Sequence, residues 1–174
     1  MWCVLHVKNG DEERTEAFLR RLLPEELGTK CFHFTRYCRK KYGGKWQMIQ
    51  DKLFPGYVFI DTDRPEAVHR ALKQVPELRL LFSDNTFISV MENEETGFLS
   101  LIADGEGKIG LSEIDIDLGK HVSYLSGPLA HAGHLVKRVD LHRRRAEVET
   151  RFLGEECVLY LGIWIRGEKA SRRK

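Results

Sequence analysis

The pattern of apolar residues changes once along the chain, near residue 119, and this change constrains the fold more than any other feature. Before it, short apolar runs typical of strands alternate with runs of helical spacing. After it, only short strand-like runs remain, separated by turn residues at spacings typical of small barrels. The sequence therefore predicts an α+β sandwich domain followed by a small all-β domain. The 174 residues are enough for two such domains, each with a modest core.

The first hundred residues are predicted to fold in the order strand, helix, hairpin, strand, helix, strand, helix. The expected strands are 2–7, 31–39, 45–53, 56–61, 80–82 and 87–90, and the expected helices are 12–23, 92–101 and one that Pro65 opens. Gly43 and Gly44 supply the positive φ that a tight hairpin needs between 31–39 and 45–53. The basic residues at the tip of this hairpin are Arg39, Lys40, Lys41 and Lys45. The order predicts a sandwich dominated by antiparallel strands.

The last fifty-six residues contain four further strand-like runs. They are 121–125, 134–141, 146–152 and 157–161. Gly133 precedes the second of these runs, where either a positive φ or a close backbone approach would require glycine.

Charge is distributed unevenly, although the formal net charge of the whole chain is only +2. Residues 1–100 are neutral in sum, residues 101–118 carry −4 and residues 119–174 carry +6. The acidic block also contains Gly105, Gly107 and Gly110 without a sustained apolar period, which predicts a flexible linker over 102–118. We therefore expect domains at 1–101 and 119–174, the second with affinity for a polyanion.

Several classes of protein are disfavoured. The longest uncharged apolar run, Cys157–Ile165, has nine residues, whereas a membrane-spanning helix needs ~20. The amino-terminal residues lack the basic segment and cleavage site of a secretory signal, so a cytoplasmic protein without a membrane partner and with reduced cysteines is expected.

An enzyme or zinc protein is the alternative class. Cys31, His33 and Cys38 are near one another in sequence, but they match no two-residue cysteine spacing. The sequence has no Gly-rich phosphate loop, nucleophile elbow or helix-borne pair of metal ligands. We therefore expect no catalytic residue, no metal and no cofactor.

Two segments resemble motifs of one family. Leu53-Phe54-Pro55-Gly56-Tyr57-Val58-Phe59 resembles the signature of the amino-terminal domain of the NusG family of transcription elongation factors. Residues 122–140, which include Ser126-Gly127-Pro128-Leu129-Ala130 and Gly133-His134-Leu135-Val136, resemble the KOW motif that follows it, an SH3-like barrel. The arginine run of the second domain is similar to that of a specialised paralogue of the LoaP type, an antiterminator of long operons.

The resemblance implies that the first domain binds the clamp helices of the largest RNA polymerase subunit through an apolar depression. The matching positions are His6, Phe54, Pro55, Tyr57, Leu81 and Phe82. The alternative for Phe54 and Tyr57 is that they fill the core. The opposite face would approach the non-template DNA strand with Lys8, Arg14, Arg21 and Arg79, and the alternative for these residues is a solvated helix surface.

The second domain is expected to bind RNA, because arginine's planar fork suits phosphate contacts. The candidate residues are His131, His134, Lys137, Arg138, Arg143, Arg144, Arg145 and Arg151, interrupted by Glu147 and Glu149. The resemblance implies a monomeric processive antiterminator recruited by a nascent leader RNA hairpin. A general elongation factor without RNA selectivity is the alternative within the family.

Overall fold

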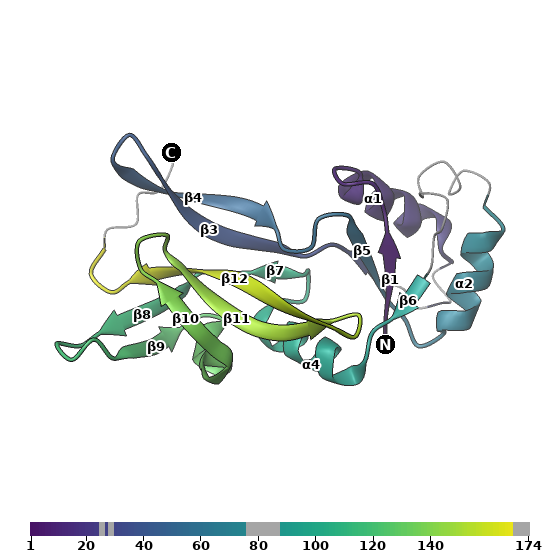
Figure 1. The fold of residues 1–174 in the computed structure, drawn as a ribbon. Helices are drawn as coiled ribbons and strands as arrows, with labels where there is room; N and C mark the ends of the chain where they lie inside the picture. The colour runs from purple at the N-terminus through teal and green to yellow at the C-terminus, as the bar shows by residue number, and fades with distance from the viewer. Residues whose placement is uncertain (25–26, 28–29, 76–87, 169–174) are drawn as a thin grey trace. The chain divides into compact units, whose positions relative to one another are not determined.

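The computed structural model describes residues 1–24, 27, 30–75 and 88–168, and it divides the chain into two compact units (Figure 1). Unit 1 consists of Met1–Phe34 and Phe54–Thr96, and unit 2 consists of Thr35–Leu53 and Gly97–Lys174. Within the described ranges, none of the helices has the length and apolar character needed to cross a lipid bilayer.

Unit 1 is built on a four-stranded antiparallel sheet with the strand order β2-β5-β1-β6. Its strands are β1 (Trp2–His6), β2 (Lys30–Phe32), β5 (Tyr57–Asp61) and β6 (Ile88–Val90). β1 pairs with β5 along its whole length and ends where His6 faces Tyr57. The predicted strands 2–7, 56–61 and 87–90 are confirmed, whereas 80–82 lies outside the described residues.

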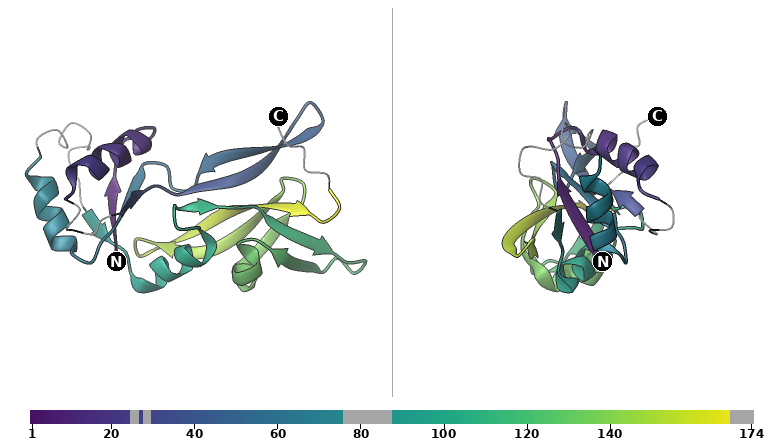
Figure 2. Two further views of the ribbon diagram at one scale, coloured as in Figure 1. Left: turned by 180° about the vertical axis from the view of Figure 1, so that it is seen from behind. Right: turned by 90° about the vertical axis from the view of Figure 1, so that its right-hand side faces the viewer.

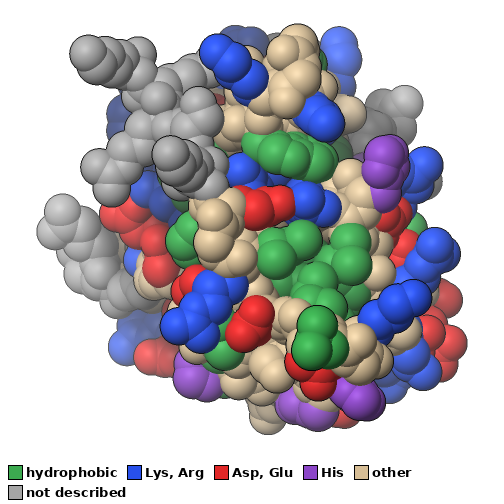
Figure 3. Space-filling view, turned by 90° about the vertical axis from the view of Figure 1, so that its left-hand side faces the viewer, with side chains coloured by type: hydrophobic (Ala, Val, Ile, Leu, Met, Phe, Trp, Pro, Cys, Tyr) green, Lys and Arg blue, Asp and Glu red, His purple; other side chains and the backbone are tan. Residues whose placement is uncertain are grey.

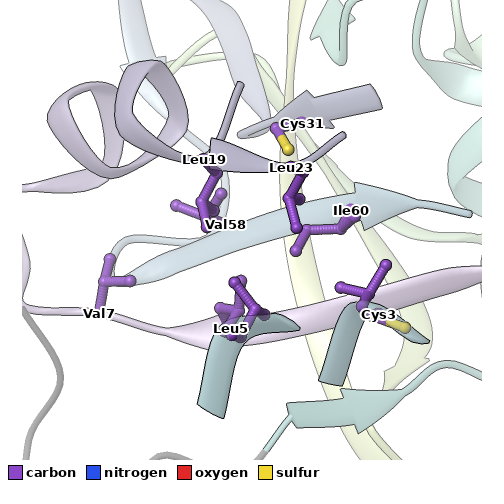
Figure 4. Close-up of a cluster of buried hydrophobic side chains, with 10 residues drawn as sticks. Cys3, Leu5, Val7, Leu19, Leu23, Cys31, Val58 and Ile60 are labelled. Carbon is purple, nitrogen blue, oxygen red and sulfur yellow. The ribbon is translucent and has the colours of Figure 1, made fainter. Parts of the chain in front are cut away.

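Helices α1 (Glu12–Leu22) and α2 (Pro65–Lys73) pack against one face of this sheet (Figures 1 and 2). The buried cluster between the helices and the sheet consists of Cys3, Leu5, Val7, Leu19, Leu23, Cys31, Val58, Ile60, Val68 and Leu72. Alternate residues of β1 and β5 supply it, because successive side chains of a strand point to opposite faces. Figure 4 shows Leu19 and Leu23 directed at Val58 and Ile60. Both predicted helices are confirmed.

An aromatic cluster fills the other side of the sheet. Its members are Trp2, Phe32, Phe34, Phe54 and Phe59, and all five are buried. The rings of Phe34 and Phe59 meet edge to face, with centroids 4.7 Å apart, a geometry that aromatic pairs favour. Burial on both faces explains why β1 reads as a continuous apolar run.

Unit 2 contains the predicted hairpin, formed by β3 (Thr35–Tyr42) and β4 (Lys45–Lys52). Gly43 and Gly44 have φ values of 53° and 78°, as the turn requires. The single strand expected over 31–39 is divided: β2 pairs with β5, and β3 begins at Thr35. Phe34 lies between them and is buried in the aromatic cluster. The two-residue β7 (Lys108–Ile109) pairs with β3 in parallel.

The rest of unit 2 is β-rich. Five strands form a sheet in the order β10-β11-β12-β8-β9. They are β8 (Ser112–Ile116), β9 (Val122–Ser126), β10 (Val136–Asp140), β11 (Arg145–Phe152) and β12 (Glu155–Ile165). Between β9 and β10 lie α5 (Leu129–Ala132) and a short 3-10 turn, Gly133–Leu135. The helix expected over 92–101 is α4 (Asn93–Ile102). The predicted fold class, a mixed unit followed by a β-rich one, is confirmed.

The expectation of a flexible linker over 102–118 is wrong. Ser112–Ile116 is β8, which pairs with both β12 and β9. Ser112 and Ile114 are fully buried, and the acidic Glu113 and Asp115 alternate with them on the outward side. Two of the five acidic residues of this segment therefore belong to the outward face of a strand with period-two alternation.

The structure also decides the role of Gly133. Its φ is −59°, so a positive φ is not the reason for glycine. A Cβ at this position would lie 2.4 Å from the ring of Tyr124. Close approach of an aromatic side chain is therefore what glycine permits here.

Candidate functional site

The signature segment forms a rigid turn at the start of β5. Gly56 has a φ of +83°, and its carbonyl oxygen accepts a hydrogen bond from the Val7 N–H at 2.8 Å. The carboxylate of Glu12 is fully buried and accepts hydrogen bonds from the N–H groups of Gly56, at 2.7 Å, and Gly10, at 2.8 Å. One buried side chain thus ties the turn to the loop that precedes α1.

The turn presents a small aromatic surface. His6 is exposed and Tyr57 is half-buried, with their ring centroids 5.1 Å apart. Pro55 is exposed between two buried neighbours, Phe54 and Gly56. Phe54 is only 7% exposed and packs against Phe34 and Phe59, so it supports the turn from the core side. The structure thus brings His6, Pro55 and Tyr57 together at the surface.

The remaining candidate residues of unit 1 are not part of this aromatic surface. Lys8, Arg14 and Arg21 are exposed, and the last two lie seven residues apart on α1, which places them on one helix face. Leu81, Phe82 and Arg79 lie outside the described residues. Glu12 was missed by the sequence reasoning, although its position at the start of a helix, two residues after Gly10, was a usable signal.

The arginine run consists of Arg143 and Arg144, at the end of the turn between β10 and β11, and Arg145, the first residue of β11, and its members differ in their contacts. Arg143 is exposed. Arg144 forms an ion pair with Glu168 and lies over the ring of Trp46 at 4.9 Å. Arg145 lies over the ring of Tyr160 at 4.1 Å. The guanidinium group of Arg143 also lies 3.9 Å from the Asp140 carboxylate, so all three groups have contacts within the protein, and Arg143 differs in being 65% exposed.

Glu168 is the centre of this arrangement. Its carboxylate also pairs with Arg39 of β3, at 2.6 Å, and the Arg39 side chain is buried. Burial alone would raise the pKa of Glu168, but hydrogen bonds from Arg144 and the Ile165 N–H, with the charges of both arginines, hold that pKa below its usual value. Glu168 therefore stays ionised at neutral pH and joins the hairpin to the β10–β11 turn.

The other predicted RNA-binding residues spread along the sheet. On β11, Arg145, Glu147, Glu149 and Arg151 alternate with inward residues, so the two glutamates lie between the two arginines on the outward face. Lys137 pairs with Glu149 at 3.0 Å, whereas Arg138, His131 and His134 are exposed. The eight residues do not form one continuous patch.

The hairpin contributes basic residues to the same end of unit 2. Lys40, Lys41 and Tyr42 are exposed, and they line one cavity of about 650 Å³ together with His142 and Arg143. Figure 3 shows a face on which hydrophobic side chains lie among Lys and Arg, with Asp, Glu and His side chains interspersed. Sequence reasoning noted the basic hairpin tip but did not connect it with residues a hundred positions later.

The residues of the alternative zinc hypothesis have other roles. Cys31 is buried, and burial raises the pKa of its thiol to about 11. His33 contacts Glu16 through Nδ1 at 2.6 Å. In the part of the chain that the structure describes, no cluster of three or more His, Cys, Asp or Glu side chains is arranged to hold a metal ion.

Comparisons with known proteins agree with the motif of the amino-terminal half. A family model described as "Transcription termination factor nusG" matches residues 1–97. The transcription termination/antitermination protein NusG of Thermus thermophilus is 23% identical over 172 residues, which cover 92% of this chain and 94% of that protein. The protein of the same name from Bacillus subtilis is 21% identical over 92% of this chain and 93% of its own length. The corresponding values for the Rickettsia prowazekii protein are 19%, 93% and 86%.

Fold, motifs and matches together indicate a family of transcription termination and antitermination factors. The chain belongs to the NusG family.

Proposed function

We propose that this protein is an elongation and antitermination factor that binds RNA polymerase through residues 1–101 and a nascent leader RNA hairpin through residues 119–174. The observation that carries the first half is the exposed His6–Tyr57 ring pair beside Pro55, fixed by the buried Glu12 carboxylate. The printed names of its relatives, which are termination/antitermination proteins, support this class of activity.

The aromatic surface suits an apolar protein partner. A tyrosine with a polar tip, next to a rigid Pro-Gly turn, loses little conformational entropy on binding and is a common interface hot spot. The partner we propose is the clamp helices of the largest polymerase subunit. A factor bound there acts as a brace that keeps the clamp closed, so that pausing and termination are suppressed without chemistry on a substrate. Lys8, Arg14 and Arg21 would then be free to approach the non-template DNA strand.

The specialised role, of the LoaP type, rests on the basic second half of the chain. Arg138 and Arg143 are exposed cations near the β10–β11 turn. Structured RNA is recognised mainly through its shape and backbone, which such groups contact. Recruitment by one leader hairpin would restrict the factor to one or a few operons.

A general elongation factor without RNA selectivity is the second candidate. It is favoured by the contacts of Arg144 with Glu168 and of Arg145 with Tyr160, which occupy two of the arginines. Transcript profiling after deletion of the gene separates the two candidates. The specialised factor changes one or a few operons, and the general factor changes most.

Replacing Tyr57 with alanine tests the polymerase contact. Loss of a hot-spot ring is expected to weaken binding to RNA polymerase by about thirtyfold, measured by biolayer interferometry with the purified enzyme. Tyr57→Phe should retain most of the affinity because the ring remains. Val90→Ala, which truncates an exposed side chain on β6 of the same unit, is the matched control. Equal affinities for wild type and Tyr57→Ala would refute the proposed surface.

A further inference from the structure

The cavity in unit 2 has not yet been given a role. It has a volume of about 650 Å³ and is lined by residues of the β3–β4 hairpin, of the segment 142–145 at the β10–β11 turn and of β12. Seven of the lining residues are Lys or Arg, and one, Asp51, is acidic. The lining therefore has the composition of an anion-binding site.

Part of this positive charge is neutralised by the protein. The guanidinium groups contact four carboxylates, those of Asp51, Asp140, Glu147 and Glu168. When these are counted against the seven cations, a net charge of +3 remains. Lys40, Lys41 and Arg143 are the exposed cations of the lining, and Arg143 shares the Asp140 carboxylate with Arg145, each at 3.9 Å. These cations come from two segments about a hundred residues apart.

The two segments are held together by close backbone packing and part-buried polar contacts. β3 lies directly against Gly162 of β12, where a Cβ would be 2.3 Å from the carbonyl oxygen of Tyr37. Arg36 donates a hydrogen bond to the carbonyl oxygen of Tyr160 at 2.6 Å. Glu168 joins Arg39 to Arg144. The exposed cations are thus presented by a preorganised wall, which lowers the entropic cost of binding.

Aromatic side chains are interleaved with the cations. Trp46 is half-buried, and the guanidinium groups of Arg39 and Arg144 lie over its ring, at 5.6 and 4.9 Å. Tyr42, next to Lys41, is 51% exposed. An exposed ring beside lysines is the arrangement on which unpaired bases stack while their phosphates contact the cations. An acidic peptide would use the cations but gain little from the ring.

We propose that this groove, formed jointly by Lys40, Lys41 and Tyr42 of the hairpin and by Arg143 of the β10–β11 turn, binds unpaired nucleotides of RNA. The inference rests on the proposed RNA-binding function and extends it. The RNA site is composite, so the barrel region alone holds only part of it. Tyr42 stacks on one base, and the three cations contact the adjoining phosphates.

The test uses the full-length protein and two fluorescein-labelled probes, a single-stranded uridine oligomer and a blunt, fully paired RNA duplex of the same length. Affinity is measured by fluorescence anisotropy at several salt concentrations. Lys40→Ala/Lys41→Ala should reduce the slope of log affinity against log salt by about 1.4 for the single strand, because each lost phosphate contact is worth about 0.7. Tyr42→Ala should weaken binding of that probe by about tenfold, whereas Tyr42→Phe should not.

Arg70→Ala/Lys73→Ala removes two exposed charges from α2 and serves as the matched control. Circular dichroism melts confirm that each variant is folded. One outcome is that Arg143→Ala weakens RNA binding while the variants of the β3–β4 hairpin, Lys40→Ala/Lys41→Ala and Tyr42→Ala, bind as the wild type does. In that case RNA binding stands and the composite groove is refuted. If the wild type binds neither probe, the RNA-binding function fails, and the groove with it. If an acidic peptide competes with both probes and Tyr42→Ala has no effect, the groove is a peptide site.

Discussion

Replacing Glu12 with alanine is expected to lower the free energy of unfolding by about 3 kcal/mol. The carboxylate is fully buried and accepts hydrogen bonds from the N–H groups of Gly10 and Gly56. Its removal leaves the buried N–H of Gly56 and the part-buried N–H of Gly10 without this acceptor, and it opens a cavity beside the turn. Urea denaturation followed by circular dichroism measures the change.

The same substitution should also weaken polymerase binding, because Gly56 precedes Tyr57 and the turn sets the direction of that ring. Glu12→Gln keeps the volume of the side chain but replaces one of the two acceptor oxygens with an NH₂ group. One of the two backbone N–H groups then loses its acceptor, so an intermediate loss of stability is expected. Glu13→Ala is the matched control, since Glu13 is the next residue of α1 and its side chain is 59% exposed. If Glu12→Ala lowers the affinity for polymerase no more than Glu13→Ala does, the Glu12 carboxylate does not position the turn.

Replacing Gly127 with alanine should destabilise unit 2 by about 3 kcal/mol. Gly127 has a φ of +77°, and a Cβ there would lie 2.4 Å from the carbonyl oxygen of Leu111 and 2.8 Å from the Cα of Ser112. Both neighbours are backbone atoms at the start of β8, so relief requires movement of that strand. The expected loss combines backbone strain with displacement of the β8–β12 pairing.

Gly154→Ala separates these two contributions. Gly154 has a similar φ of +83°, but nothing lies within 4 Å of its Cβ position. Its substitution should therefore cost only the strain, about 1 kcal/mol. Equal melting temperatures for the two variants would mean that the close approach of the Leu111 carbonyl oxygen to residue 127 does not restrict which residue can stand there.

Local sequence patterns were sufficient where an element is specified by its own residues. The spacing of apolar residues over 12–23 predicted α1, and Gly43-Gly44 predicted the hairpin turn. The error over 102–118 has a physical cause: the acidic residues of β8 alternate with Ser112, Ile114 and Ile116, and the strand is too short for this period to stand out beside three glycines. The burial of Ser112 was also hidden, since its Oγ accepts a hydrogen bond from the Leu129 N–H, seventeen residues later.

The candidate sites depend more on contacts between distant segments. The sequence indicated which cations were present near Arg143, but it did not show that Glu168 holds both Arg144 and Arg39. These pairs join residues 24 and 129 positions apart, a separation at which no local pattern exists. The same holds for Glu12, whose partner Gly56 lies 44 residues away. Residue type and charge were therefore predictable, whereas the division between structural and exposed arginines was not.

The central claim is that one molecule holds RNA polymerase and a particular nascent RNA at the same time. Sequencing the RNA that co-purifies with the crosslinked full-length protein tests it most directly. We expect reads concentrated in the leader of one or a few operons, with the largest polymerase subunit in the same fraction. Reads spread over all transcripts in proportion to their abundance, or a fraction without RNA, would contradict it.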